Sequence, residues 1–264
     1  MEWVKVEWHA DTAHLVMNNP PLNLWTTQFM EQLTIAIEQI HAKRHSLRAL
    51  LVRSATEQFS GGVNVGEAFA GRGEAAGREI LKCHLPSIQM LEQLPFPTVA
   101  AVHGYCLAGG FELALACDLI IASDDAILGQ AEALIGTGTL LNGASRLAQR
   151  IGVARAKEAV FFAQFRPAAE WHTWGVVNKV VPKAELQVAA QGWVDRLAKG
   201  PTQAHAVTKG MLQEYASGGL AAADAWTLLH APRLFDTQDM QGGVAALVEH
   251  GARKIREKGE FHNQ

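Results

Sequence analysis

The sequence has little of what marks several protein classes. Its 264 residues include only three cysteines, with no CxxC pair and no metal-ligand spacing, which is typical of reduced thiols in a cytoplasmic protein. The histidines form no HExxH motif, so we expect no metal site. There is no run of like charges, and the formal net charge is −3 at pH 7. A nucleic-acid partner, which would usually meet a basic stripe, is therefore not expected.

Long apolar runs and targeting signals are missing as well. The longest apolar stretch, residues 98–122, is interrupted by His103, Glu112 and Asp118, and so predicts no membrane span. The N-terminal residues lack the charged-then-apolar pattern of a signal peptide, which again favours a cytoplasmic location. No P-loop, GxGxxG or GxSxG motif is present, so NTPase, dinucleotide-binding and serine hydrolase functions have no support.

What the chain does contain is an alternation of short apolar strands, glycine turns and helices, which favours an α/β architecture. Apolar residues at helical spacing after Thr26 and Thr27 predict a helix, whereas the polar segment 66–82 is expected to form a loop and helix outside the core. From residue 186 onward the pattern is helical, with breaks at Gly200, Gly218 and Gly251. The predicted strands are residues 4–8, 13–17, 47–52, 98–102 and 118–122.

Two glycine pairs stand out because each follows a predicted strand. The first lies in residues 59–64, and the second is Gly109–Gly110, where the chain turns into a helix. Paired glycines let the backbone approach a ligand closely, and a helix N-terminus offers unpaired N–H donors. Two such donors converging on one oxygen form an oxyanion hole. The alternative is that both segments are only tight turns.

Two carboxylates lie near the second glycine pair. Glu112 falls inside an otherwise apolar helix, where an unpaired charge is costly, and Glu132 follows twenty residues later. If the intervening strand folds back, both side chains face one pocket and form an acid/base pair. The alternative places Glu132 on the surface and pairs Glu112 with a core arginine.

These residues resemble the signature of the crotonase superfamily, which is the enoyl-CoA hydratase/isomerase family. In that resemblance Val63 and Gly109 supply the two oxyanion N–H groups, and Glu112 and Glu132 are the two catalytic glutamates. The similarity extends over five ordered segments, residues 59–64, 98–118, 129–132, 168–182 and 236–253.

The resemblance also implies an architecture. It predicts an α/β fold in which residues 1–199 form a crotonase-like spiral of repeated ββα units with the active site. Residues 200–264 then form a C-terminal helical region for trimerisation. The expected partners are an acyl-CoA thioester substrate and further copies of the chain in a homotrimer or hexamer. No metal or other cofactor is expected, since coenzyme A is part of the substrate.

The activity that the resemblance implies is that of a lyase, an enoyl-CoA hydratase that adds water across the 2,3 double bond of a 2-enoyl-CoA. Glu112 would activate the water and Glu132 would deliver a proton to the α-carbon. Gly62, Asn64, Gly110 and Leu140 are the expected substrate-binding residues. The alternatives are enoyl-CoA isomerisation or acyl-CoA hydrolysis on the same scaffold, or a non-catalytic acyl-CoA-binding member.

The sequence departs from the family pattern at places that bear on the substrate. Val63 is bulkier than the usual alanine, and Asn64 stands where an aspartate is common. Residues 137–143 replace a proline- and glycine-rich helix entry, and Leu140 and Leu141 within them predict a drier pocket. The sequence therefore leaves the acyl group open.

Overall fold

The computed structural model describes residues 2–251, 261 and 263. The strands are β1 (Val4–Trp8), β2 (Thr12–Met17), β3 (Ala49–Ser54), β4 (Thr98–Val102), β5 (Tyr105–Leu107), β6 (Leu119–Ser123), β7 (Ile127–Gly129), β8 (Phe165–Pro167) and β9 (Lys179–Val181). The helices are α1 (Thr27–Ala42), α2 (Val65–Ala68), α3 (Glu74–Glu92), α4 (Gly109–Ala116), α5 (Gly143–Ile151), α6 (Val153–Phe161), α7 (Ala168–Thr173), α8 (Leu186–Ala198), α9 (Thr202–His230) and α10 (Gln238–His250). Three short 3₁₀ helices are η1 (Glu132–Ile135), η2 (Lys183–Glu185) and η3 (Ala231–Asp236).

Two sheets organise the described part of the chain. The larger has the order β1-β2-β3-β4-β6-β9, and all of its neighbours run parallel except β1 and β2. The smaller has the order β5-β7-β8, with β5 and β7 parallel. Every residue of β2 and β4 is buried, as expected for parallel strands covered on both faces. The predicted α/β class is confirmed.

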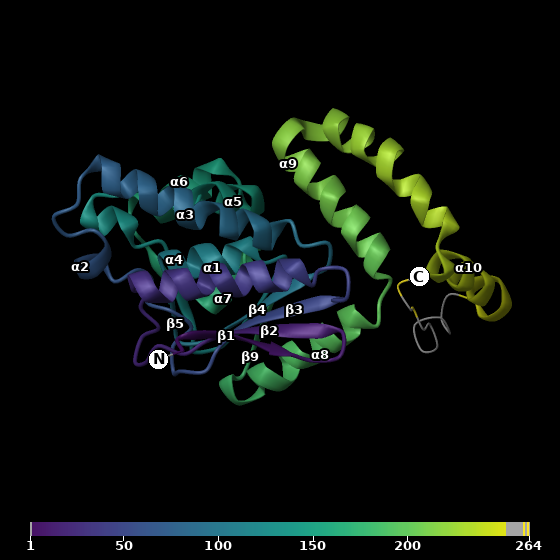
Figure 1. Cartoon of the computed structure of the whole chain (residues 1–264), viewed down its shortest axis with the longest axis horizontal. Coiled ribbons are helices and arrows are strands. Elements are labelled where there is room, and N and C mark those ends of the chain that lie inside the picture. The colour runs from purple at the N-terminus through teal and green to yellow at the C-terminus, as the bar shows by residue number, and fades with distance from the viewer. Residues whose placement is uncertain (1, 252–260, 262, 264) are drawn as a thin grey trace.

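Helices cover the larger sheet on both faces (Figure 1). α1 and α3 pack against each other on one side, and α8 contacts β3, β4 and β6 on the other. The main hydrophobic core lies beneath α1 and α4, and a smaller one lies beneath α8. This arrangement leaves the turns after β3 and β5 beside α1 and α3.

Local sequence explains where these elements begin. Thr26 caps α1 by accepting a hydrogen bond from the Phe29 amide at 3.1 Å, as the sequence predicts. The strand predicted at residues 118–122 begins one residue later, because the Asp118 carboxylate accepts the Thr98 amide at 2.8 Å. The segment predicted as loop and helix at residues 66–82 runs into α3, a helix of 19 residues.

The described C-terminal part is helical, as predicted; in the predicted regions 200–264 and 236–253, residues 252–260, 262 and 264 lie outside the described residues. In Figure 1, α9 leaves the body of the molecule and leads through η3 to α10. Gly219, at φ 73°, breaks the helical geometry within α9, where the Gly218–Gly219 break is predicted. No helix among the described residues is long and apolar enough to cross a membrane.

Candidate active site

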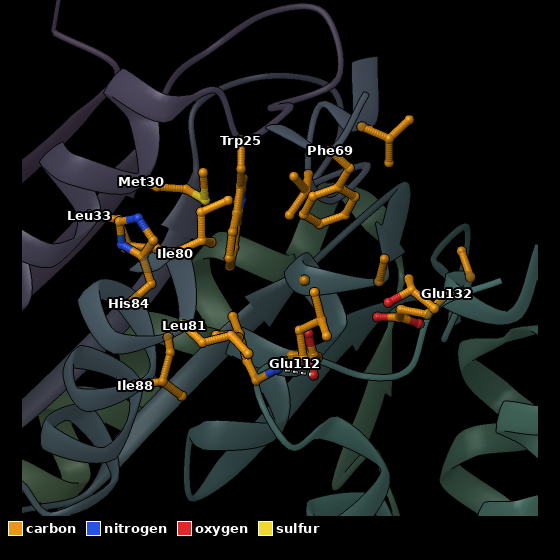
Figure 2. A pocket seen from close by; sticks show the side chains of 18 of the residues that line it. Trp25, Met30, Leu33, Phe69, Ile80, Leu81, His84, Ile88, Glu112 and Glu132 are labelled. Atoms are coloured by element: carbon orange, nitrogen blue, oxygen red, sulfur yellow. Dashed lines mark hydrogen bonds between the residues drawn. The ribbon is translucent and has the colours of Figure 1, made fainter. Parts of the chain in front are cut away.

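A cavity of about 180 Å³ lies between α1, α3 and the two glycine turns. Apolar side chains form most of its wall, and Figure 2 shows Glu112 and Glu132 among them. The wall includes Trp25, Met30, Leu33, Val63, Phe69, Ile80, Leu81, Ile88, Ala108, Gly109, Leu140 and Leu141. Burying a charge in such surroundings is costly, so the two glutamates are the chemically informative part of the wall.

Glu112 lies in the first turn of α4, a helix whose residues are all buried. Its Oε1 accepts hydrogen bonds from the amides of Leu141 at 2.9 Å and Gly143 at 2.8 Å. Burial raises the pKa of the Glu112 carboxyl to about 7, although the two amides and the charge of Arg146 lower it. Arg146 forms hydrogen bonds with both carboxylate oxygens of Glu92 at 2.6 Å. The alternative of Glu112 bound to a core arginine is therefore wrong.

Glu132 begins η1 and is only 7% exposed, so the alternative of a surface position is wrong as well. When the amide of Gln130 is assigned with its nitrogen facing this carboxyl group, that nitrogen donates to the two oxygens of Glu132 at 2.9 and 3.0 Å. Burial raises the pKa of the Glu132 carboxyl to about 8, and the charge of Glu112 adds to the effect. The chain thus folds back and brings both acids to one cavity, as the sequence predicts.

The two predicted amide donors lie at the same cavity. Val63 pairs with Trp25 in a parallel bridge, in which the Trp25 amide donates to Gly62 O at 2.8 Å and the Asn64 amide donates to Trp25 O at 2.9 Å. This pairing leaves the Val63 amide outside the ladder. Within the described residues, neither the Val63 amide nor the Gly109 amide donates to another protein group. Both are therefore available to a ligand oxygen.

Of the expected substrate-binding residues, only Leu140 lines the cavity. Gly62 and Gly110 instead join the two turns: a Cβ on Gly62, at φ +90°, would lie 2.9 Å from Ala108 Cβ, and one on Gly110 would lie 2.6 Å from Ser60 Cβ. Asn64 caps α2 with its side chain. Ala108 itself has φ 48°, a conformation that non-glycine residues rarely adopt, and it aims the start of α4 at the cavity.

The sequence did not single out the wall that α1 and α3 provide. α1 contributes Met30, Leu33 and Thr34, and α3 contributes a stripe from Ile80 to Ile88. The signal that could have found the second wall is the helical spacing of residues 80, 81, 84, 87 and 88.

Two amide donors beside two buried acids define a class of site, one that stabilises a developing negative charge on oxygen while protons move at neighbouring atoms. The comparisons with known proteins agree with this class. Residues 7–258 match the model of the family described as Enoyl-CoA hydratase/isomerase.

Individual relatives support the same assignment. The chain is 28% identical over 253 residues to a short-chain-enoyl-CoA hydratase of Clostridium acetobutylicum, covering 96% of each chain. It is 30% identical over 200 residues to a probable enoyl-CoA hydratase, EchA17, of Mycobacterium bovis, covering 76% of each. A Geobacillus kaustophilus structure titled as an enoyl-CoA hydratase subunit superposes with a TM-score of 0.89 at 26% identity, covering 99% of this chain and 98% of that one.

The chain therefore belongs to the enoyl-CoA hydratase/isomerase family, whose members act on acyl-CoA thioesters. The predicted crotonase fold is confirmed by the same structural likeness.

Proposed function

We propose that this protein is an enoyl-CoA hydratase that adds water across the 2,3 double bond of a 2-enoyl-CoA thioester. The observation that supports this most is the pairing of Glu112 and Glu132 at one cavity, each with a raised pKa, beside the unpaired amides of Val63 and Gly109. Relatives that carry the hydratase name point the same way.

The mechanism assigns a separate task to each group. The thioester oxygen accepts hydrogen bonds from the Val63 and Gly109 amides, which stabilise the enolate-like charge that forms when water adds to C3. Glu112, whose anion is stabilised by two backbone donors, removes a proton from the water. Glu132, with the higher pKa of the pair, delivers its proton to C2.

The products distinguish hydration from its alternatives on the same scaffold. Incubation with crotonyl-CoA is expected to remove the absorbance of the conjugated thioester and to raise the product mass by that of one water. An unchanged mass with a shifted double bond would show isomerisation, and release of free coenzyme A would show hydrolysis. Either result would contradict the proposal.

The rate of hydration is expected to depend on pH as a bell, with its maximum between about pH 7 and 8. Below this window Glu112 is protonated and cannot take a proton from water, because its pKa is about 7. Above it Glu132 loses the proton that it must donate, because its pKa is about 8. Since the two carboxyl groups interact, the two apparent pKa values taken from the acid and alkaline limbs of the profile belong to the pair rather than to either residue alone. Stopped assays of kcat/KM between pH 5 and 10 measure the profile, since kcat/KM reports the groups of the free enzyme, and a flat profile would contradict the acid/base roles.

Gly62→Ala is expected to lower kcat by about 10². The added methyl group meets Ala108 at 2.9 Å and Leu107 O at 3.0 Å, and the residue must keep a φ of +90°, so the turns separate and the two amides no longer converge. The control is Gly66→Ala, since a Cβ at Gly66 meets only Asn64 at 3.7 Å. Equal loss in both variants, measured with crotonyl-CoA, would rule out this role for Gly62.

We further propose that the enzyme is cytoplasmic, that it needs no metal or cofactor, and that it assembles as a homotrimer or hexamer. Exposed large apolar side chains on α9, η3 and α10 support assembly. They are Leu212, Tyr215, Leu220, Leu228, Leu229, Phe235, Val244, Leu247 and Val248.

A further inference from the structure

Three polar side chains interrupt the apolar wall between α1 and α3. Thr34 belongs to α1, His84 and Ser87 belong to α3, and all three line the cavity. Their neighbours in the wall are apolar, among them Leu33 and Ile88. Figure 2 shows His84 on the side of the cavity away from Glu132, with Leu81 between His84 and Glu112. The polar cluster therefore lies at the end of the cavity away from the acids.

The hydrogen bonds within this cluster assign the proton of the histidine. Ser87 Oγ donates to the carbonyl of His84 at 2.8 Å, so it accepts from Thr34 Oγ1, which lies 3.4 Å away. Because the single hydroxyl proton of Thr34 is donated to Ser87, Thr34 Oγ1 accepts the hydrogen bond from His84 Nδ1 at 3.2 Å. A neutral imidazole with its proton on Nδ1 has a lone pair on Nε2.

Nε2 of His84 is consequently an acceptor. Burial lowers the pKa of His84, which keeps the ring neutral near pH 7 and preserves that lone pair. No described residue donates a hydrogen bond to Nε2, and Nε2 is not among the buried polar atoms that lack a partner, so it remains accessible. The group that would complete the cluster is a hydrogen-bond donor.

The occupant of this end is the acyl group rather than the nucleotide part of coenzyme A. None of the described residues that line the cavity is lysine or arginine, so this part of the wall offers phosphates no cationic partner. The wall between Glu112 and His84 is aliphatic, which suits a hydrocarbon chain.

We propose that the preferred substrate carries a hydroxyl group at the far end of its acyl chain, and that this hydroxyl donates a hydrogen bond to Nε2 of His84. The inference rests on the proposed function for the orientation of the thioester at Val63 and Gly109. Thr34 and Ser87 act as positioning residues, because they fix the proton of His84 on Nδ1.

The test compares the binding of unreactive, saturated acyl-CoAs with and without a terminal hydroxyl, lengthened one carbon at a time. At the length that reaches His84, the hydroxylated ligand is expected to bind about fivefold more tightly by calorimetry. A pocket without a fitting acceptor would instead favour the plain chain at every length, since an unpaired hydroxyl resists burial. That result would overturn the inference.

Two variants locate the effect. His84→Leu is expected to abolish or reverse the preference for the hydroxylated ligand while keeping affinity for the plain one. Thr34→Val, which retains the imidazole but releases its Nδ1, is expected to weaken the preference. A preference that persists in His84→Leu would overturn the role of His84.

A separate assay distinguishes failure of the proposed function. Hydration of plain 2-enoyl-CoAs tests the chemistry without reference to the hydroxyl. If no hydration were detected but the preference for the hydroxylated ligand were observed, the hydratase function would be refuted and the role of His84 would stand.

Discussion

Replacing either acid with its amide is expected to lower kcat for hydration of crotonyl-CoA by about 10² or more, since each change removes one of the two proton transfers. Glu112→Gln leaves no base for the water, and Glu132→Gln leaves no acid for C2. Both glutamine side chains have nearly the shape of glutamate, so the fold should remain intact. Initial rates at the pH optimum, together with circular dichroism, measure both expectations.

Glu74→Gln is the matched control, because the Glu74 side chain is 86% exposed on α3 and, within the described part of the chain, forms an ion pair with Arg78 alone. It should retain the activity of the unaltered protein. Rates of that same order in Glu112→Gln or Glu132→Gln would refute the assignment.

The stability of the variants gives a second readout. A carboxyl whose pKa rises from 4.5 to about 8 on folding contributes stability that is complete below pH 4.5 and is lost as the pH rises through 8. Glutamine at residue 132 cannot ionise, so Glu132→Gln is expected to be the more stable protein at pH 8 in thermal unfolding, with less advantage at pH 4. A substitution that removes activity and yet stabilises the fold is typical of a residue with a catalytic rather than a structural role.

Gly143→Ala is expected to lower kcat by a comparable factor, about 10², although residue 143 is not itself a catalytic group. A Cβ at this position would lie 2.7 Å from Glu112 Cγ and 2.5 Å from the Gln130 amide, so either Glu112 or its loop must move. The move lengthens the 2.8 Å bond from the Gly143 amide that stabilises the anion. The pKa of Glu112 should therefore rise, and the acid limb of the rate profile should shift to higher pH.

Gly138→Ala provides the comparison within the same loop, because a Cβ there meets nothing within 4 Å. It should leave both kcat and the acid limb unchanged. If Gly143→Ala lowered kcat without moving the acid limb, the contact with Glu112 would not be the cause.

The sequence predicted those parts of the structure that depend on local pattern. The helix α4 and the strand β4 fall at the predicted residues, because glycine turns and continuous apolar runs identify them. The convergence of Glu112 and Glu132 was also predicted, but only through the resemblance, since the spacing alone left their relative direction open.

The rest depended on contacts between distant segments. The amides of Leu141 and Gly143 donate to Glu112 because of the path of their loop, and no pattern in the sequence predicts that path. The wall formed by α1 and α3 requires two helices to pack around a cavity, and polar side chains in segment 66–82 concealed its apolar stripe. Gly62 and Gly110 were assigned to the substrate because glycine near a ligand and glycine between two close chains look alike in a sequence.

The contact between the two turns constrains more of the chain than the chemistry does. In the proposed mechanism the thioester oxygen contacts only the amides of residues 63 and 109, yet the turns that carry them are held together by Gly62 against Ala108 and by Gly110 against Ser60. A side chain larger than hydrogen at residue 62 or 110 would force the two turns apart, so these two contacts set the distance between the donors. The substrate range can therefore change through substitutions in the cavity wall formed by α1 and α3. The two turns tolerate fewer substitutions, because Gly62 and Gly110 must remain small although neither is expected to touch the thioester.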